Sequence, residues 1–127
     1  MDKHQILDEF GQRYMSFVRD TVIKDMLEII NGQYGGNRRE LEQGISKIPN
    51  EFKNILQLFV ATSIDKTLHY SLFMLQEYED DTKLIIEDEE GNKNSLAEVS
   101  DGLCGELYTE DGWIERFSKY PSSVPNK

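Results

Sequence analysis

The chain has 127 residues, of which 38% are hydrophobic and 30% charged, a balance typical of a globular protein with a modest core. Its net charge is −10, and residues 77–127 hold 14 acidic against 5 basic residues, net −9, so the excess is concentrated there. This charge disfavours binding to nucleic acid or to an anionic membrane, since both require a basic patch, and favours a basic protein partner; acidity that serves only solubility is the alternative.

Residues 2–31 are expected to form an amphipathic helix. Its apolar residues follow helical spacing as a drifting stripe, made of Leu7, Phe10, Tyr14, Phe17, Val18, Val22, Met26, Ile29 and Ile30. Arg19 and Asp20 are assigned to other faces, so the stripe should pack on the rest of the protein. Gly11 costs about 1 kcal/mol inside a helix, and Gly32 favours the helix end.

The longest predicted helix covers residues 50–78, which contain neither Gly nor Pro. Pro49 disfavours helix at the residue before it, and Asn50 is a good N-cap. Upstream, a short helix is predicted over 38–48, capped by Asn37. Because the long helix carries apolar residues on most sides, we expect it to be covered on most sides as the centre of the fold. Its longest uncharged run is 11 residues, which is short of the ~20 that a bilayer requires.

The last third is expected to change character. Residues 83–94 predict a small β-hairpin with an acidic turn, Ser95 begins a capping box for a short helix, and Thr109 should cap a last helix that ends near residue 120. The fold class is therefore mainly α: a compact helical bundle around one long central helix (50–78), with a possible small β-hairpin near 83–94. A single helical domain over residues 1–120 would be followed by a mobile tail at 121–127.

Two groups of residues were candidates for catalysis or metal binding. Cys104 lies between Leu103 and Gly105, but a catalytic Cys needs a His base, and a lone Cys is more often a small buried hydrophobe. Asp65 and His69 are four residues apart on one helix face, a spacing that permits a hydrogen bond or two metal ligands. A buried polar pair that satisfies itself is the favoured interpretation. We thus predict no catalytic residue, no cofactor and no metal site, and a protein that is not an enzyme.

The acidic third is the candidate partner-binding surface. Carboxylates in turns next to a Trp suit a protein interface, although Trp113 could instead anchor the last helix in the core. The predicted partner-binding residues are Glu87, Asp88, Glu89, Glu90, Asp101, Glu106, Glu110, Asp111 and Trp113.

Residues 100–118, with the sequence SDGLCGELYTEDGWIERFS, resemble the C-terminal segment of small bacterial immunity proteins. These proteins neutralise the toxin domains of contact-dependent growth inhibition and related polymorphic toxin systems. The resemblance implies a cognate toxin, often a nuclease, that is blocked by charge-complementary binding. The function expected is thus a toxin-neutralising immunity protein that binds a basic, nuclease-type toxin domain through its acidic surface.

Two alternatives from other classes stay open at this point. One is a small enzyme that uses Cys104 or Asp65 with His69, and the other is an acidic adaptor or DNA-mimic protein. The first ten residues are charged and carry no apolar signal-peptide region, and one cysteine excludes an internal disulfide, so a cytoplasmic location is expected.

Overall fold

The computed structural model of the protein describes residues 2–35 and 39–121. Its elements in chain order are α1 (Lys3–Arg13), the π-helical segment η1 (Tyr14–Arg19), α2 (Asp20–Ile30), α3 (Arg39–Ser46), the 3-10 turn η2 (Asn50–Phe52), α4 (Lys53–Glu77), β1 (Ile85–Glu87), β2 (Lys93–Ser95), α5 (Leu96–Val99), the 3-10 helix η3 (Leu103–Leu107) and α6 (Trp113–Phe117). The mainly helical fold, the long helix and the small hairpin are confirmed.

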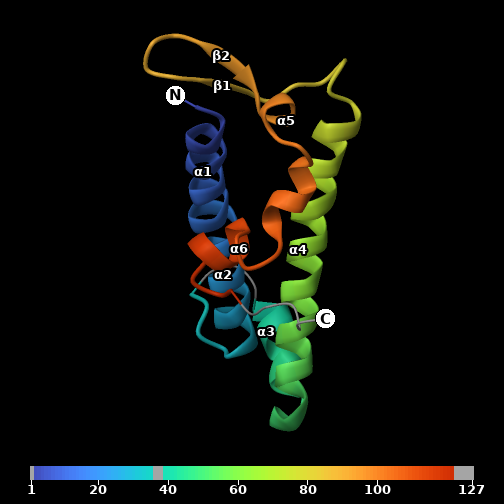
Figure 1. Cartoon of the computed structure of the whole chain (residues 1–127). Helices are drawn as coiled ribbons and strands as arrows, with labels where there is room; N and C mark the ends of the chain where they lie inside the picture. Colours follow the sequence, from blue (N-terminus) through green and yellow to red (C-terminus); the bar gives the residue numbers. More distant parts are fainter. Residues whose placement is uncertain (1, 36–38, 122–127) are drawn as a thin grey trace.

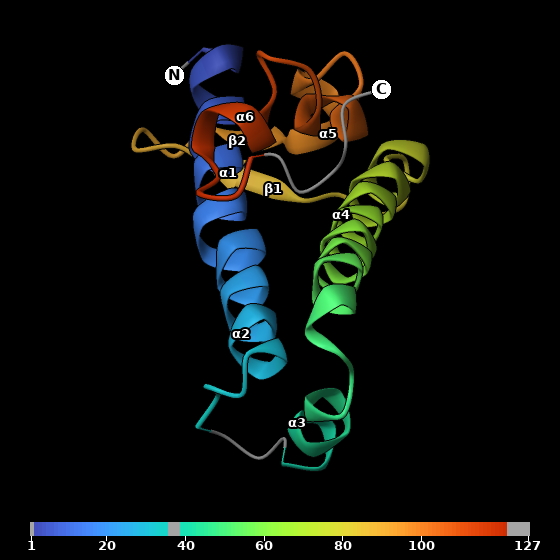
Figure 2. The same cartoon turned by 90° about the horizontal axis from the view of Figure 1, so that it is seen from below.

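Two long helical columns run antiparallel through the molecule (Figure 1). The first is one continuous helix formed by α1, η1 and α2, and the second is α4 with its entry turn η2. The hairpin of β1 and β2 lies beside the start of α1, whereas α3 lies at the far end of the two columns. In a second view the two columns lie side by side, and α5 and α6 lie toward the end of the columns opposite α3 (Figure 2).

The main core lies where α1, η1 and the C-terminal half of α4 meet α5, η3 and α6. Its buried side chains are Ile6, Leu7, Met15, Leu68, Leu72, Leu96, Leu103, Leu107, Trp113 and Ile114. A smaller cluster of Ile29, Ile30 and Ile45 joins α2 to α3, with Leu56 and Val60 of α4 packed against it. The short C-terminal elements are therefore held by core contacts rather than by helix propensity, since helices of four or five residues are not stable alone.

The face of the first helix that is buried differs from the predicted one, because the helix contains a π-helical segment. In η1 the backbone N–H of Asp20 donates to the carbonyl of Met15, five residues back, so the helix is locally wider than 3.6 residues per turn. The inward face consequently shifts along the sequence. Arg19 and Asp20, assigned to outer faces, are buried, while Phe17 of the predicted apolar stripe is 79% exposed.

The expectation that the long helix is covered on most sides was wrong. The side chains of α4 that are buried are Ala61, Asp65, Leu68 and Leu72, all on the side that faces α2 and η3. Most of its other large apolar residues are exposed, with Ile55 at 66% and Phe59 at 69%. The described chain supplies elements for one side of this helix and none for the opposite side.

Several predicted helix ends also needed correction. The hydroxyl of Ser95 donates to Glu79 at 3.0 Å and makes no cap, so α5 begins without the expected capping box. Thr109 has a positive φ of 73° instead of capping a helix, and α6 begins at Trp113 and ends at Phe117. The Asn37 cap and, apart from Pro121, the mobile tail at 121–127 lie outside the described residues.

Gly11 leaves space for a neighbouring side chain, so its replacement by alanine should destabilise the protein, whereas Gly→Ala within a helix usually stabilises. A Cβ at this position would overlap the indole ring of Trp113, which is fully buried and cannot move aside. Gly11→Ala should therefore lower the free energy of unfolding by about 1–2 kcal/mol, because overpacking outweighs the gain in helix propensity of about 1 kcal/mol.

Gly44 in α3 is the matched control, because nothing lies within 4 Å of the place that a Cβ would take there. Gly44→Ala should raise the free energy of unfolding by about 0.5–1 kcal/mol. Urea denaturation followed by circular dichroism measures both variants. Two alanine substitutions that stabilise to the same extent would contradict the close approach of Trp113 to Gly11.

Candidate functional site

The hairpin turn carries four of the predicted partner-binding carboxylates. Asp88 accepts hydrogen bonds from the backbone N–H groups of Asn92 at 2.9 Å and Glu90 at 3.0 Å, and these bonds lower the pKa of its carboxyl group. The Asp88 side chain thus shapes the turn instead of pointing freely into solvent. Glu87, Glu89 and Glu90 are exposed.

The other predicted carboxylates lie in the segment that links α5, η3 and α6. Asp101 is exposed before η3, and Glu106 within η3 accepts a hydrogen bond from Ser100 at 2.7 Å. Glu110 and Asp111 are exposed in the turn that precedes α6. Arg116 holds this turn through a 2.7 Å hydrogen bond to the backbone carbonyl of Asp111, which leaves the Asp111 carboxylate outside the bond.

Trp113 does not belong to this surface, which corrects its assignment as a partner-binding residue. Its side chain is 0% exposed, and its ring lies 5.7 Å from Phe10 and 6.3 Å from Tyr14, centroid to centroid. The alternative that it anchors the last helix in the core is the one observed. The reason is that α6 is short and reaches the first helix at Gly11, where a missing side chain leaves room for the indole.

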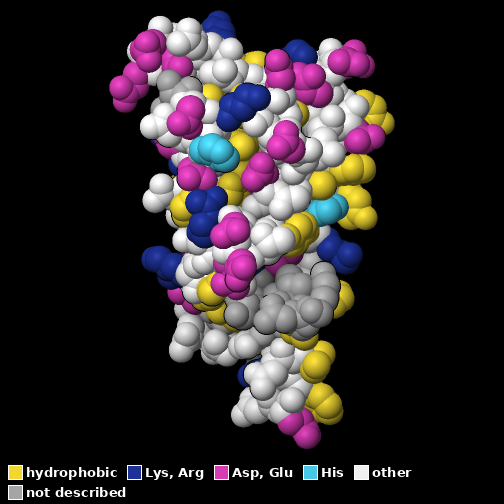
Figure 3. Space-filling model, viewed as in Figure 1, with side chains coloured by type: hydrophobic (Ala, Val, Ile, Leu, Met, Phe, Trp, Pro, Cys, Tyr) yellow, Lys and Arg dark blue, Asp and Glu magenta, His cyan; other side chains and the backbone are white. Residues whose placement is uncertain are grey.

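The acidic residues form several groups rather than one patch. Figure 3 shows Asp and Glu side chains scattered over the upper part of one face, with Lys and Arg side chains among them. Among the described residues there is no group of three or more His, Cys, Asp or Glu side chains that could hold a metal ion. The arrangement suits a broad electrostatic field better than chelation of a single cation.

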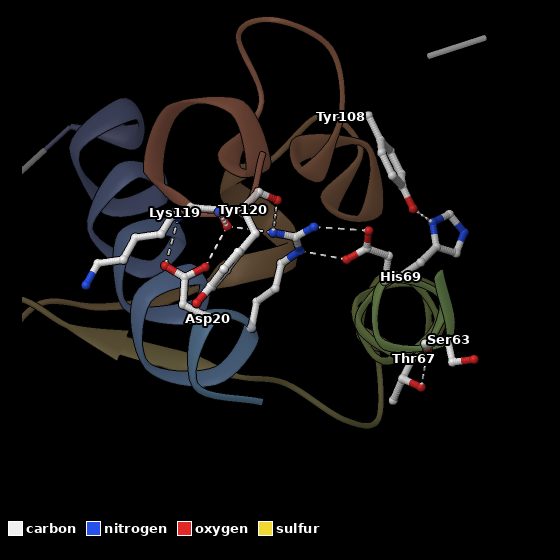
Figure 4. A network of polar contacts seen from close by, with 10 residues as sticks. Asp20, Ser63, Thr67, His69, Tyr108, Lys119 and Tyr120 are labelled. Carbon is white, nitrogen blue, oxygen red and sulfur yellow. Dashed lines mark hydrogen bonds and ion pairs between the residues drawn. The ribbon is translucent and has the colours of Figure 1, made fainter. Parts of the chain in front are cut away.

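A buried polar network lies between the two helical columns (Figure 4). Arg19 is fully buried and donates from Nε to Asp65 at 2.7 Å and from Nη2 to the second carboxylate oxygen at 3.3 Å. Such a forked, charge-assisted contact is geometrically demanding, and it links η1 to α4. Sequence reasoning missed Arg19 because the π-helical segment, which turns it inward, has no clear sequence signature.

The same network ties down the end of the described chain. Arg19 Nη1 donates to the hydroxyl of Ser118 at 2.6 Å and to the carbonyl of Tyr120 at 2.9 Å. Asp20 accepts from Ser118 Oγ at 2.6 Å and from the Lys119 backbone N–H at 3.0 Å. Two neighbouring charged residues thus hold the segment after α6 against the helices, so the network acts as a structural lock.

The predicted pair of Asp65 and His69 is divided between two sets of partners. The Asp65 carboxylate accepts a hydrogen bond from Arg19, whereas His69 Nδ1 lies 2.9 Å from the hydroxyl of Tyr108. Burial, followed by the negative charge of Asp65, raises the pKa of Tyr108, so its neutral hydroxyl is available as a hydrogen-bond donor. His69 also stacks on Phe73, with ring centroids 6.2 Å apart. The favoured interpretation, a buried polar pair that satisfies itself, is not what the structure shows: Asp65 and His69 bond to different neighbours, and His69 is only half-buried.

Cys104 lies in η3 and is half-buried. Its side chain packs against the main core, and its backbone N–H donates to Gln76 of α4 at 3.3 Å. These contacts are those of a small apolar side chain at the edge of a core.

The outer side of α4 is the most unusual surface of the described chain. Its exposed large apolar residues are Phe52 at its entry turn, Ile55, Leu58, Phe59, Tyr70, Phe73, Met74 and Tyr78. At 100° per residue, Ile55, Phe59, Tyr70 and Phe73 fall within one narrow face. Figure 3 shows hydrophobic side chains along this edge of the molecule.

Comparison with known proteins returned no relative: no protein-family model, curated protein or solved structure matches this chain. None of the helices in the described part combines the length and apolar character needed to cross a bilayer.

Proposed function

We propose that this chain is a toxin-neutralising immunity protein that acts in the cytoplasm. It binds a cognate toxin domain of basic, nuclease type through the carboxylates of the hairpin turn and of the turn before α6. The inhibitor works by occupying a surface of the toxin, not by chemistry of its own. The resemblance of residues 100–118 to immunity proteins and the acidic excess after residue 77 both support this proposal.

The proposal rests on one observation: some carboxylates are bonded within the described part of the fold, whereas four of those in the two turns are exposed and make no bond there. Asp20, Asp65 and Glu79 are engaged in hydrogen bonds or ion pairs within the fold. By contrast, the exposed side chains of Glu89, Glu90, Glu110 and Asp111 make no hydrogen bond or ion pair with any described residue. Carboxylates that the fold does not use still repel one another, and a basic partner would relieve that repulsion.

Such an arrangement acts first on the rate of association. A basic toxin surface is attracted by the negative field of these carboxylates, which can raise association rates by about 10- to 1,000-fold at low salt. The same carboxylates would then occupy positions that a nucleic-acid phosphate would take on a nuclease. Exposed charges are screened over ~8 Å at physiological ionic strength, so the rate should fall steeply as salt rises.

The proposal predicts the effect of reversing four exposed carboxylates of the two turns, which make no bond within the described part of the fold. Glu89, Glu90, Glu110 and Asp111 replaced together by Lys should slow association with the cognate toxin domain at least about 10-fold at low salt and abolish protection in cells. The proposal expects a toxin domain in the reading frame directly upstream of this chain, and a toxin domain found there is the one to use. Stopped-flow binding at low and high salt, with circular dichroism to verify the fold, measures the effect.

The matched control reverses four carboxylates elsewhere on the surface: Glu9, Asp25, Glu40 and Glu51. It avoids Asp2, which caps α1, Asp8, which pairs with Arg116, and the buried Asp20. Reversal of Glu9 breaks its ion pair with Arg13, which is exposed and contributes little stability. The control changes net charge by the same amount, so location alone separates the two variants. If both variants slowed association with the toxin equally, or if reversal of the turn carboxylates had no effect, the acidic turns would not be the binding surface. A chain that binds many DNA-binding proteins equally well would instead be a DNA mimic.

A further inference from the structure

We propose that the chain forms a two-fold symmetric homodimer in which two copies of α4 pack antiparallel through their outer faces. This interface is separate from the acidic turns and goes beyond the proposed function. The occupant of the exposed apolar face is thus a second copy of the same helix.

The exposed apolar residues of α4 and its entry turn together cover a large area. With about 200 Å² for each large apolar side chain, the exposed fractions of the eight residues from Phe52 to Tyr78 amount to roughly 850 Å². These residues divide into two patches of roughly 450 and 400 Å², each within the about 300–600 Å² of the largest apolar patch on a typical monomer, so it is only together that they are unusually large. A standard protein interface buries about 800 Å² on each partner, so the face has the area that a stable dimer needs.

The spacing of these residues along the helix is nearly symmetric about its middle. They form two patches, a lower one over residues 52–59 and an upper one over residues 70–78, on either side of Asp65. The residues at matching distances from Asp65, to within one position, are Phe52 with Tyr78, Ile55 with Met74, Leu58 with Phe73, and Phe59 with Tyr70. A two-fold axis that crosses the outer face of α4 at the height of Asp65 would place the lower patch of each copy on the upper patch of the other, as an isologous interface requires.

The middle of the face is suited to a close helix crossing. Ser63 and Thr67 are small, and their hydroxyls already donate to backbone carbonyls of the same helix, at 2.8 and 2.9 Å. Burial would therefore leave neither hydroxyl without a bond. Lys66 is the one charged residue here, and its long stem can lie along the interface while the ammonium reaches water. Because Lys66 lies one position from the proposed axis, the Lys66 side chains of the two copies come close together, and their like charges oppose association unless both ammonium groups extend into water.

Charge at the two ends does not decide the register. Lys53 and Glu77 both lie twelve residues from Asp65, but at 100° per residue they project about 120° apart around α4, so both cannot lie in one interface. The antiparallel pairing is thus favoured by the apolar positions.

Sedimentation equilibrium of the purified chain tests the proposal without any toxin. The wild type should have twice the chain mass of 14.8 kDa at ~100 µM. Phe59→Lys alone and Tyr70→Glu alone should each raise the dissociation constant by roughly 100-fold or more, because each buries a charge without a partner. Both side chains are more than half exposed in the single chain, so the monomer fold should be retained.

Recovery of the dimer tests the register itself. The double variant Phe59→Lys/Tyr70→Glu, and also a mixture of the two single variants, should dimerise again, because the antiparallel pairing places the new ammonium opposite the new carboxylate. Thr21→Lys, on an exposed position of α2, should leave the dimer unchanged. A monomeric wild type, or dimers that persist in both single variants, would overturn the proposal. Failure of the double variant and of the mixture to dimerise would overturn the antiparallel arrangement.

Discussion

Replacement of Asp65 by alanine should lower the free energy of unfolding by about 3–5 kcal/mol. Asp65 is 3% exposed and its carboxylate lies 2.7 Å from Nε of the fully buried Arg19, so the substitution leaves a guanidinium in the interior without this counter-charge. Among the described residues Arg19 also donates to the Ser118 hydroxyl and the Tyr120 carbonyl, which are both neutral. Hydrogen bonds to neutral groups do not replace the lost charge.

Urea denaturation followed by circular dichroism measures this loss, and a surface pair provides the control. Asp8 pairs with Arg116 at 2.8 Å, but both side chains are more than a third exposed, so Asp8→Ala should cost at most about 1 kcal/mol. The double variant Arg19→Met/Asp65→Leu should recover part of the stability, because apolar side chains carry no desolvation penalty. Similar costs for Asp65→Ala and Asp8→Ala would show that the buried pair is not a structural lock.

The second large effect is expected at Trp113. Trp113→Ala should lower the free energy of unfolding by about 3–5 kcal/mol, because it removes a fully buried side chain that packs on Phe10 and Tyr14. Trp113→Phe should cost much less. Among the described residues the indole Nε1 has no hydrogen-bond partner, so removal of this group relieves a penalty of about 1–3 kcal/mol.

Phe17→Ala is the comparison that separates core from surface. Phe17 belonged to the predicted apolar stripe but is 79% exposed, so its replacement should change stability by less than about 0.5 kcal/mol. Chemical denaturation of the three variants under one set of conditions gives the result. A Trp113→Ala variant that unfolds like the wild type would return Trp113 to the binding surface, where the sequence analysis placed it.

The proposed binding surface and the proposed dimer face lie on different elements. The carboxylates lie in the turns of the hairpin and before α6, whereas the apolar face belongs to α4 and its entry turn. A dimer joined through α4 would therefore carry two acidic surfaces. Toxin binding and dimerisation can then be tested by separate variants, and the failure of one proposal does not imply failure of the other.

The sequence by itself determined the elements of this protein. Helical spacing of apolar residues, with glycines after Asn31 and a proline at position 49, was sufficient to predict the two long helices to within a few residues. The hairpin followed from a short β-branched run next to an acidic turn. The exposure of Glu89, Glu90, Glu110 and Asp111 was also predictable, since a lone carboxylate is costly to bury.

Only the tertiary structure decided which face of each helix is covered. Periodicity shows that apolar residues share a face, but a single π-helical segment shifts that face, and so Arg19 moved inward while Phe17 moved outward. Periodicity likewise cannot show whether the chain has an element left to cover a face. The described part of the chain covers one side of α4 and leaves Ile55 and Phe59 exposed on the other, because burial depends on contacts between residues far apart in the sequence.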